Sequence, residues 1–288
     1  MTDLPEMRVG PGGESQHWYL PKDGETQCAY EIVGANGKWR STNLRDARKW
    51  GLLPSVSKIT RIEAAPGLEK WKRKQMMLAA LTHPLVAEMM DHDDLFKMLE
   101  KDASQQAKDA AAAGTAIHKV IEQYIQGQEV IDDDNLPYID AAHRALNEIA
   151  GRTTNRSEWG TEKAVSHAYG FGGRCDLYSE NMSIVADFKS KEFGPDDKPF
   201  AVYPNQGQAL AAYREALGMT DARCFNIFIS RTHPGLWQVV EHTQEKLSKH
   251  FHEFISMLYY WQVSNGMPLT AKPWELSGND SWRPLNGD

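Results

Sequence analysis

Three consecutive segments with the two-residue period of β-strands constrain the fold most strongly. They span residues 161–168, 171–179 and 184–190, and turn signals at Tyr169-Gly170 and Glu180-Asn181 separate them. Because connections this short join antiparallel strands, the three segments predict a β-meander. The chain therefore contains a sheet that its other elements must cover, which excludes an all-helical fold.

Segments with the 3.6-residue period of helices surround the meander. They cover residues 104–126, 136–150, 203–217 and a last stretch that Thr243 can cap. Two further strand patterns, at residues 224–230 and 237–241, lie between the last two helices. We therefore predict an α/β (α+β) fold with a central, mostly antiparallel or mixed sheet of about five strands flanked by helices.

The N-terminal part of the chain has a different pattern. Residues 1–16 are rich in Gly, Pro and acidic residues and are expected to be frayed, and short strand patterns follow at residues 17–20 and 29–33. Residues 44–90 are helical and basic. We expect an N-terminal β-hairpin and basic helical region packed on the core (1–100), the core itself (101–265) and a C-terminal tail (266–288).

The charge of the chain is unevenly distributed. The net charge of −7 would disfavour binding to nucleic acid if it were spread evenly, because Lys and Arg drive contacts with phosphate. Residues 36–77, however, hold eleven basic residues against three acidic ones. This surplus is typical either of solvated helix faces or of a DNA-binding surface. The candidate DNA-binding residues are Lys58, Arg61, Lys70, Lys72, Arg73 and Lys74.

Composition also bears on the compartment. No stretch reaches the roughly 18–20 consecutive apolar residues of a membrane helix, and the N-terminus lacks the pattern of a signal peptide. We therefore expect no membrane partner and a cytoplasmic protein of a bacterium or a phage-infected host cell. The three cysteines, Cys28, Cys175 and Cys224, have no close spacing, so neither a disulfide framework, a zinc site nor an iron–sulfur cluster is expected.

Three charged residues of the meander form the main candidate site. Asp187 and Lys189 are two residues apart in one strand and share a face, and Asp176 lies on the preceding strand, close enough along the turn to sit beside Asp187. Two adjacent carboxylates repel each other unless they share a cation, and hard oxygen ligands suit Mg²⁺ or Mn²⁺. An exposed Asp–Lys pair without function is the alternative for an isolated Asp-x-Lys.

The order of motifs around these residues resembles that of the PD-(D/E)XK nuclease superfamily, in particular its RecB-like and phage exonuclease branch. The motifs are Gly114-x-x-x-His118, Gly173-x-x-Asp176, Asp187-x-Lys189, and Gln206 or Gln208 followed by Tyr213. The resemblance covers about residues 104–218. It implies a restriction-endonuclease-like core. Some RecB-like nucleases carry four cysteines for an iron–sulfur cluster, and this chain has three.

The resemblance also implies a ligand set for a metal ion. His118, Asp176, Asp187 and the backbone carbonyl of Phe188 would hold a first Mg²⁺ or Mn²⁺, which would neutralise charge and activate water. Lys189 would lose some basicity beside the ion or stabilise the negative charge that grows on the phosphate. The resemblance does not indicate whether the site would bind one metal ion or two.

Further catalytic roles follow from the same resemblance. Glu162, at the start of the first meander strand, could bind or orient a second ion, or be an ordinary strand-end carboxylate. Gln206 and Tyr213 are seven residues apart and share a helical face, so we prefer Gln206 to Gln208 as the residue that helps to position the phosphate or the carboxylates. Arg174 is expected to face away from Asp176 and is left out of the site.

The leading functional hypothesis is a metal-dependent DNA exonuclease that hydrolyses phosphodiester bonds from DNA ends in phage or prophage recombination, repair or replication. A structure-specific or restriction-like endonuclease of the same superfamily is the alternative within enzymes. A DNA-binding module without turnover is the alternative outside them. The expected partners are DNA with a free end and a single-strand annealing or recombination protein, while polarity, strand preference and oligomeric state are not indicated.

Overall fold

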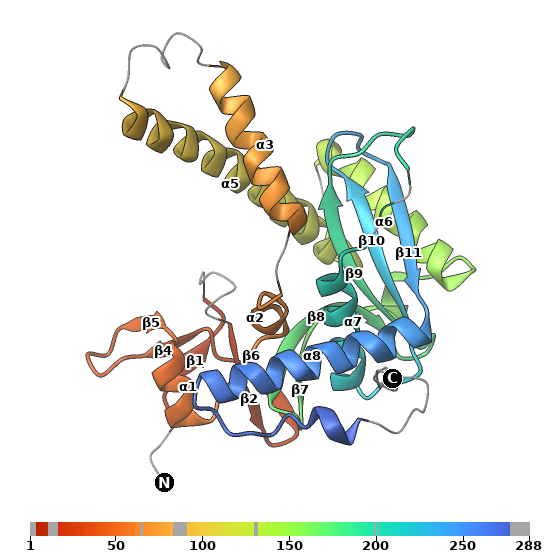
Figure 1. Cartoon of the computed structure of the whole chain (residues 1–288). Helices are drawn as coiled ribbons and strands as arrows, with labels where there is room; N and C mark the ends of the chain where they lie inside the picture. Colours follow the sequence, from red (N-terminus) through yellow and green to blue (C-terminus); the bar gives the residue numbers. More distant parts are fainter. Residues whose placement is uncertain are drawn as a thin grey trace, which may run out of the picture.

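The computed structural model describes residues 4–10, 17–63, 66–82, 91–129, 132–198, 200 and 202–276 (Figure 1). Its centre is a five-stranded sheet with the order β11-β10-β9-β8-β7. The strands are β7 (Gly160–His167), β8 (Phe171–Ser179), β9 (Ile184–Lys191), β10 (Arg223–Ser230) and β11 (Trp237–His242). β9 and β10 are parallel and the other neighbours are antiparallel. The predicted meander and the mixed five-stranded sheet are thus confirmed.

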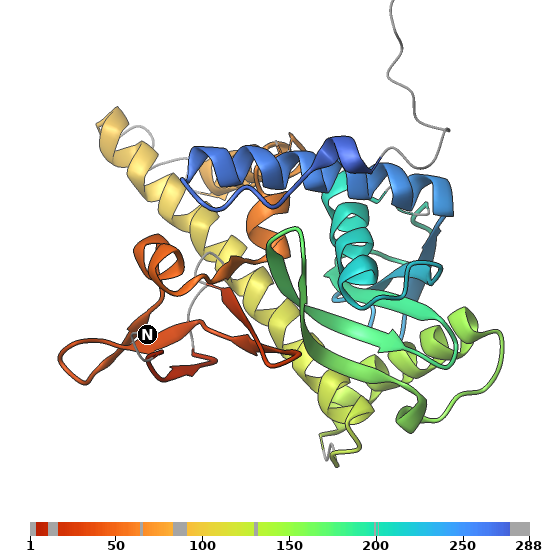
Figure 2. The ribbon, with the colours of Figure 1, turned by 90° about the horizontal axis from the view of Figure 1, so that it is seen from below.

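Helices cover both faces of the sheet. On one face, α5 (His92–Ile125) and α6 (Leu136–Ala150) bury isoleucines and alanines against Ala186, Phe188 and Ile227. On the other face lie α7 (Pro204–Ala216), which connects the two parallel strands, and α8 (Gln244–Ser264), which Thr243 caps as predicted. Figure 2 shows α8 extending along the molecule from the N-terminal strands to the sheet. The strand that carries Asp187 and Lys189, β9, therefore lies in the middle of a two-sided core.

The N-terminal region forms two small three-stranded sheets. β2 (Trp18–Lys22) pairs with β3 (Glu25–Cys28) and β6 (Leu53–Pro54), whereas β4 (Glu31–Val33) pairs with β1 (Met7–Arg8) and β5 (Trp39–Ser41). The expected N-terminal hairpin is present and turns at Asp23-Gly24, but its second strand is residues 25–28, whereas residues 31–33 pair in the other small sheet. Residues 7 and 8 are also paired rather than frayed.

Where the structure describes the basic segment of this region, it forms the helices α1 (Leu44–Trp50), α2 (Val56–Thr60) and α3 (Pro66–Thr82). In Figure 1, α3 and the first part of α5 lie side by side and project away from the sheet. The side chain of Asp91 caps α5, accepting a hydrogen bond from the backbone N–H of Asp93 at 3.1 Å, so the helix begins at His92 rather than at residue 104. The boundary expected at residue 100 thus falls within one continuous helix.

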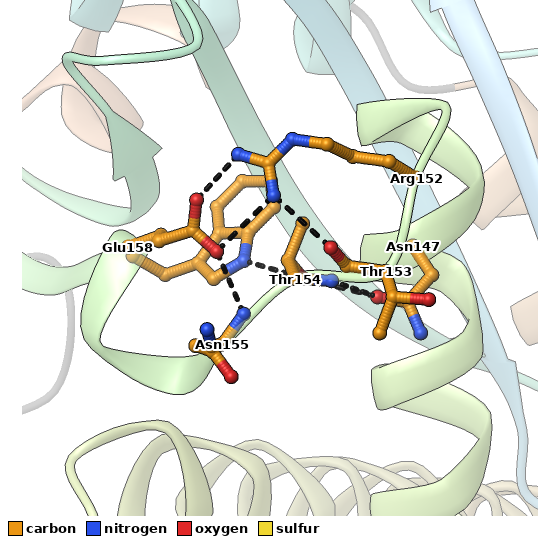
Figure 3. Close-up of polar contacts among 7 residues, drawn as sticks. Asn147, Arg152, Thr153, Thr154, Asn155 and Glu158 are labelled. Atoms are coloured by element: carbon orange, nitrogen blue, oxygen red, sulfur yellow. Dashed lines mark hydrogen bonds and ion pairs between the residues drawn. The ribbon is translucent and has the colours of Figure 1, made fainter.

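A hydrogen-bonded loop fixes the entry to β7 (Figure 3). The Asn147 side chain accepts a hydrogen bond from the backbone N–H of Thr154 at 2.7 Å, and the indole N–H of Trp159 donates to the Thr154 hydroxyl at 3.1 Å. Arg152 and Glu158 form an ion pair across the loop. Because these contacts tie the loop to α6 at Asn147 and join its two ends through Arg152 and Glu158, they help to fix where β7 begins.

The chain after α8 returns over the body of the protein. Met267 and Ala271 are buried, and Trp274 packs edge-on against Tyr259 at 5.4 Å between ring centroids. Trp274 therefore contacts α8 while remaining 61% exposed, and Trp282 lies outside the described residues. Within the described parts of the chain, no helix has the length and apolar character needed to cross a membrane.

Candidate active site

The two charged residues of the Asp-x-Lys motif contact each other on β9. The ammonium of Lys189 lies 2.5 Å from Oδ1 of Asp187 and 3.3 Å from the backbone oxygen of Phe188. The Asp187 side chain is 8% exposed and that of Lys189 is 36% exposed. Burial lowers the pKa of Lys189, but the attraction of Asp187 and Asp176 outweighs it and raises the pKa overall. In this arrangement Lys189 is a cation at neutral pH.

Asp176 and Asp187 meet where β8 and β9 stop pairing. The last paired residues are Leu177 and Ala186, and the next position on each strand is a carboxylate. Burial, followed by the repulsion of Asp187, raises the pKa of Asp176 well above its usual range, although Lys189 lowers it. Two carboxylates thus share a half-enclosed site in which the negative charge is only partly balanced.

His118 approaches the carboxylates from α5. Its Nδ1 lies 3.9 Å from Oδ2 of Asp176. Burial and the neighbouring Lys189 lower the pKa of His118 to about 4, so the imidazole is neutral at pH 7. The helix can come this close because Gly114 has no side chain: a Cβ there would lie 2.6 Å from the hydroxyl oxygen of Ser190 on β9. The glycine of the Gly-x-x-x-His motif thus lets α5 pack closely on β9, one turn before His118.

A buried amide behind Asp187 was not predicted from the sequence. Asn226, on β10 directly opposite Asp187, donates from Nδ2 to Oδ2 of Asp187 at 2.9 Å, and its Oδ1 accepts from Nε2 of His242 at 2.8 Å. Asn226 is fully buried. Burial lowers the pKa of His242 to about 4, so its Nε2–H is a neutral donor. Both oxygens of Asp187 are thereby fixed, one by Lys189 and one by Asn226.

Replacing Asn226 by leucine is expected to weaken both the fold and the site. It leaves one oxygen of Asp187 and the N–H of His242 without a partner, which costs about 1–3 kcal/mol of unfolding free energy, and it frees Asp187 to turn, which lowers activity by roughly tenfold or more. Urea unfolding and kcat measure the two effects. Asn147→Ala, in the loop of Figure 3, is the control: it should cost stability without loss of kcat, and equal kcat losses would contradict the role of Asn226.

Glu162 and Arg174 form an ion pair at the edge of the site. Burial raises the pKa of Glu162, and the charge of Arg174 opposes that rise. Glu162 also repels Asp176, so its carboxylate lies near the pair described above. The expectation that Arg174 faces away is therefore wrong: positions two apart in a strand share a face, so Arg174 and Asp176 belong to the same surface. The alternation of side chains along the strand already indicates from the sequence that Arg174 and Asp176 share a face.

The polar residues of α7 differ in position. Tyr213 packs against Gly173 beside the site, where a Cβ would lie 2.4 Å from its ring, and burial, followed by the charge of Asp176, raises its pKa. Gln206 instead accepts a hydrogen bond from the backbone N–H of Tyr203 at 3.1 Å, closing the first turn of the helix. Gln208 is buried and donates to Glu63 at 3.0 Å. Tyr213 thus lies near the carboxylates, whereas the two glutamines form hydrogen bonds with other groups.

The donor types of this cluster fit a hard divalent cation. Two carboxylates, one neutral imidazole and the carbonyl of Phe188 are the groups that bind Mg²⁺ or Mn²⁺, and the unbalanced charge at Asp176 is what such an ion would relieve. As the side chains stand, no group of three His, Cys, Asp or Glu residues within the described ranges is gathered for a metal. Cys175 and Cys224 are buried in the core and Cys28 lies in β3.

The predicted DNA-binding residues lie on two helices: Lys58 and Arg61 on or directly after α2, and Lys70, Lys72, Arg73 and Lys74 on α3. Lys58 lies over the Trp18 ring, 3.6 Å from its centroid, and burial lowers its pKa to about 8. Arg61 is exposed at the end of α2. Lys72 pairs with Glu69 at 3.1 Å. An open hollow of about 440 Å³ on α3 is lined by Lys70, Trp71, Arg73, Lys74 and Met77. The role of these residues in binding DNA stays a prediction.

No protein-family model and no curated protein matches this chain. Among solved structures, that of a proposed exonuclease from Eubacterium rectale matches 54% of this chain and 68% of its own, with 12% identity and a TM-score of 0.36. The structure of SSO0001 matches 59% of this chain and 76% of its own, with 15% identity and a TM-score of 0.28. Similarity at this level defines neither the family nor the activity of the chain.

Proposed function

We propose that this chain is a metal-dependent DNA exonuclease of the PD-(D/E)XK type. The observation that supports the proposal most is the contact of Lys189 with Asp187, beside a second carboxylate, Asp176, whose charge is not balanced. An ammonium next to paired carboxylates suits phosphodiester hydrolysis, because a metal ion on the carboxylates and the ammonium can neutralise negative charge before and during attack on the phosphate.

In this proposal each residue has a distinct task. His118, Asp176, Asp187 and the carbonyl of Phe188 hold a Mg²⁺ or Mn²⁺ ion, which supplies charge neutralisation and activation of water when bound. Lys189 places its ammonium against the phosphate oxygens on which negative charge grows. Tyr213 supports the carboxylates from α7, and Glu162, now paired with Arg174, is available to a second ion only if that pair opens.

The biological setting is part of the same proposal. Action in phage or prophage recombination, repair or replication, and partnership with a single-strand annealing protein, rest on the order of the four motifs in the sequence. The basic hollow on α3 supports DNA as the substrate, because Lys70, Arg73 and Lys74 can neutralise backbone phosphates and Trp71 lies among them.

Linear and closed circular DNA distinguish the proposed activity from its alternatives. We expect purified protein to release nucleotides from end-labelled linear DNA in Mg²⁺ or Mn²⁺, to release none in chelator, and to leave the closed circle intact, because an exonuclease needs an end. The label that leaves first gives the polarity. Cutting of the circle would replace the proposal with an endonuclease, and binding without metal-dependent cleavage would replace it with a DNA-binding module.

A further inference from the structure

The catalytic strand continues beyond Lys189 to a second lysine on the same face. Lys191 is two residues further along β9, about 7 Å away, and both lie on the face of the sheet that carries Asp187. The ammonium of Lys191 lies over three aromatic rings, 4.4 Å from the centroid of Phe200, 4.5 Å from that of Phe228 and 5.0 Å from that of Tyr203. Neither this lysine nor these rings have a role in the mechanism above.

The charge of Lys191 has no anionic partner in the part of the chain that the structure describes. Its ammonium forms neither an ion pair nor a hydrogen bond there, whereas Lys189 contacts Asp187 and Lys163 contacts Glu180. Burial lowers the pKa of Lys191, in line with a half-enclosed cation that no carboxylate compensates. An anion that approaches along β9 would meet this charge directly after that of Lys189.

Of the aromatic rings beside Lys191, Phe228 is buried and Tyr203 is half exposed to solvent. Phe228 is fully buried, and the Phe200 ring packs against it and against the buried Phe193, with ring centroids 5.1 Å and 5.0 Å apart. Tyr203, directly before α7, is 50% exposed. A flat, exposed ring held next to an uncompensated cation offers a stacking surface and a charge at the same place.

We propose that Lys191 and Tyr203 form a binding subsite for one nucleotide of an unpaired strand, with its phosphate on Lys191 and its base stacked on Tyr203. The proposal rests on the proposed nuclease function, which places the cleaved phosphate at Lys189. A base inside a duplex already has both faces stacked on its neighbours, so it must leave the stack before the Tyr203 ring can contact its face, which an unpaired base does at no such cost. The subsite therefore assigns single-stranded ends, or ends that fray, as the preferred substrate.

Equilibrium binding to two DNA probes tests this subsite. Fluorescence anisotropy in chelator, where cleavage does not interfere, compares a short single-stranded oligothymidylate with a blunt duplex of equal length. We expect Tyr203→Leu and Lys191→Gln each to weaken binding of the single strand roughly tenfold, with little change for the duplex. Tyr203→Phe, which keeps the ring, should bind like the wild type. The matched controls are Tyr260→Leu, an exposed tyrosine on α8, and Lys163→Gln.

Each outcome separates the subsite from the nuclease function. Selective loss for the single strand in both variants, with recovery in Tyr203→Phe, supports the subsite. Equal losses on both probes would overturn it in favour of general electrostatic binding. Unchanged affinities in variants of a wild type that cleaves DNA would overturn the subsite alone. A wild type that neither binds nor cleaves DNA would overturn the subsite and the nuclease function together.

Discussion

Lys189→Ala is expected to lower the rate of DNA cleavage by at least about 10²–10³-fold, the usual effect of removing one group that stabilises charge in a transition state. The Lys189 ammonium lies within 2.5 Å of Asp187 and 3.3 Å of the carbonyl of Phe188, so it stands at the centre of the carboxylate site. Its side chain is 36% exposed, so its removal leaves no large cavity in the core. Single-turnover cleavage of linear DNA in saturating Mg²⁺ measures the loss.

Two matched variants separate a catalytic from a general electrostatic effect of Lys189. Lys189→Arg keeps a positive charge at the site but changes its shape, so it should retain more activity than alanine. Lys163→Ala removes a lysine of β7 that pairs with Glu180 and should cleave like the wild type. Circular dichroism and thermal unfolding check that each variant is folded. Activity of Lys189→Ala within a few-fold of the wild type would end the proposed role of this residue.

The central sheet and its two carboxylates could be predicted because both depend on local sequence. Alternation within a strand places Asp187 and Lys189 on one face, and the short turn between β8 and β9 fixes the register that brings Asp176 beside Asp187. Asn226 could not be found in this way. Its contact with Asp187 arises from the parallel pairing of β9 with β10, and the whole of α7 separates those strands in sequence.

The predictions that failed depend on partners distant in sequence or on a misjudged alternation. The pairing of β4 with β1 and β5, rather than with β2, is a tertiary choice that strand propensity does not encode. For Lys58 the role in DNA binding stays a prediction, although the sequence did not show that its side chain packs on the Trp18 ring of another element. The error on Arg174 was avoidable, because its distance of two residues from Asp176 already implied a shared face.

Asp176→Asn is expected to abolish metal-dependent cleavage and, in chelator, to stabilise the protein. Burial and the repulsion of Asp187 raise the pKa of Asp176 well above its usual range. Between the ordinary and the raised value, the folded protein therefore holds a proton that the unfolded chain releases, so the stability of the metal-free wild type falls as pH rises through that interval. Asparagine has the shape of the protonated acid and does not titrate, so the variant loses this dependence.

Thermal unfolding at two pH values, with chelator and with Mg²⁺, measures this effect. At pH 4 the two proteins should unfold at similar temperatures. At pH 8 in chelator the variant should be more stable by on the order of 1 kcal/mol, or roughly 2–4 °C in Tm, and Mg²⁺ should then stabilise the wild type but not the variant, because only the wild type offers both carboxylates. If the variant were less stable at pH 8 in chelator, burial of the Asp176 charge and its repulsion by Asp187 would not destabilise the metal-free protein as proposed. Equal stabilisation of both proteins by Mg²⁺ would instead place the ion elsewhere.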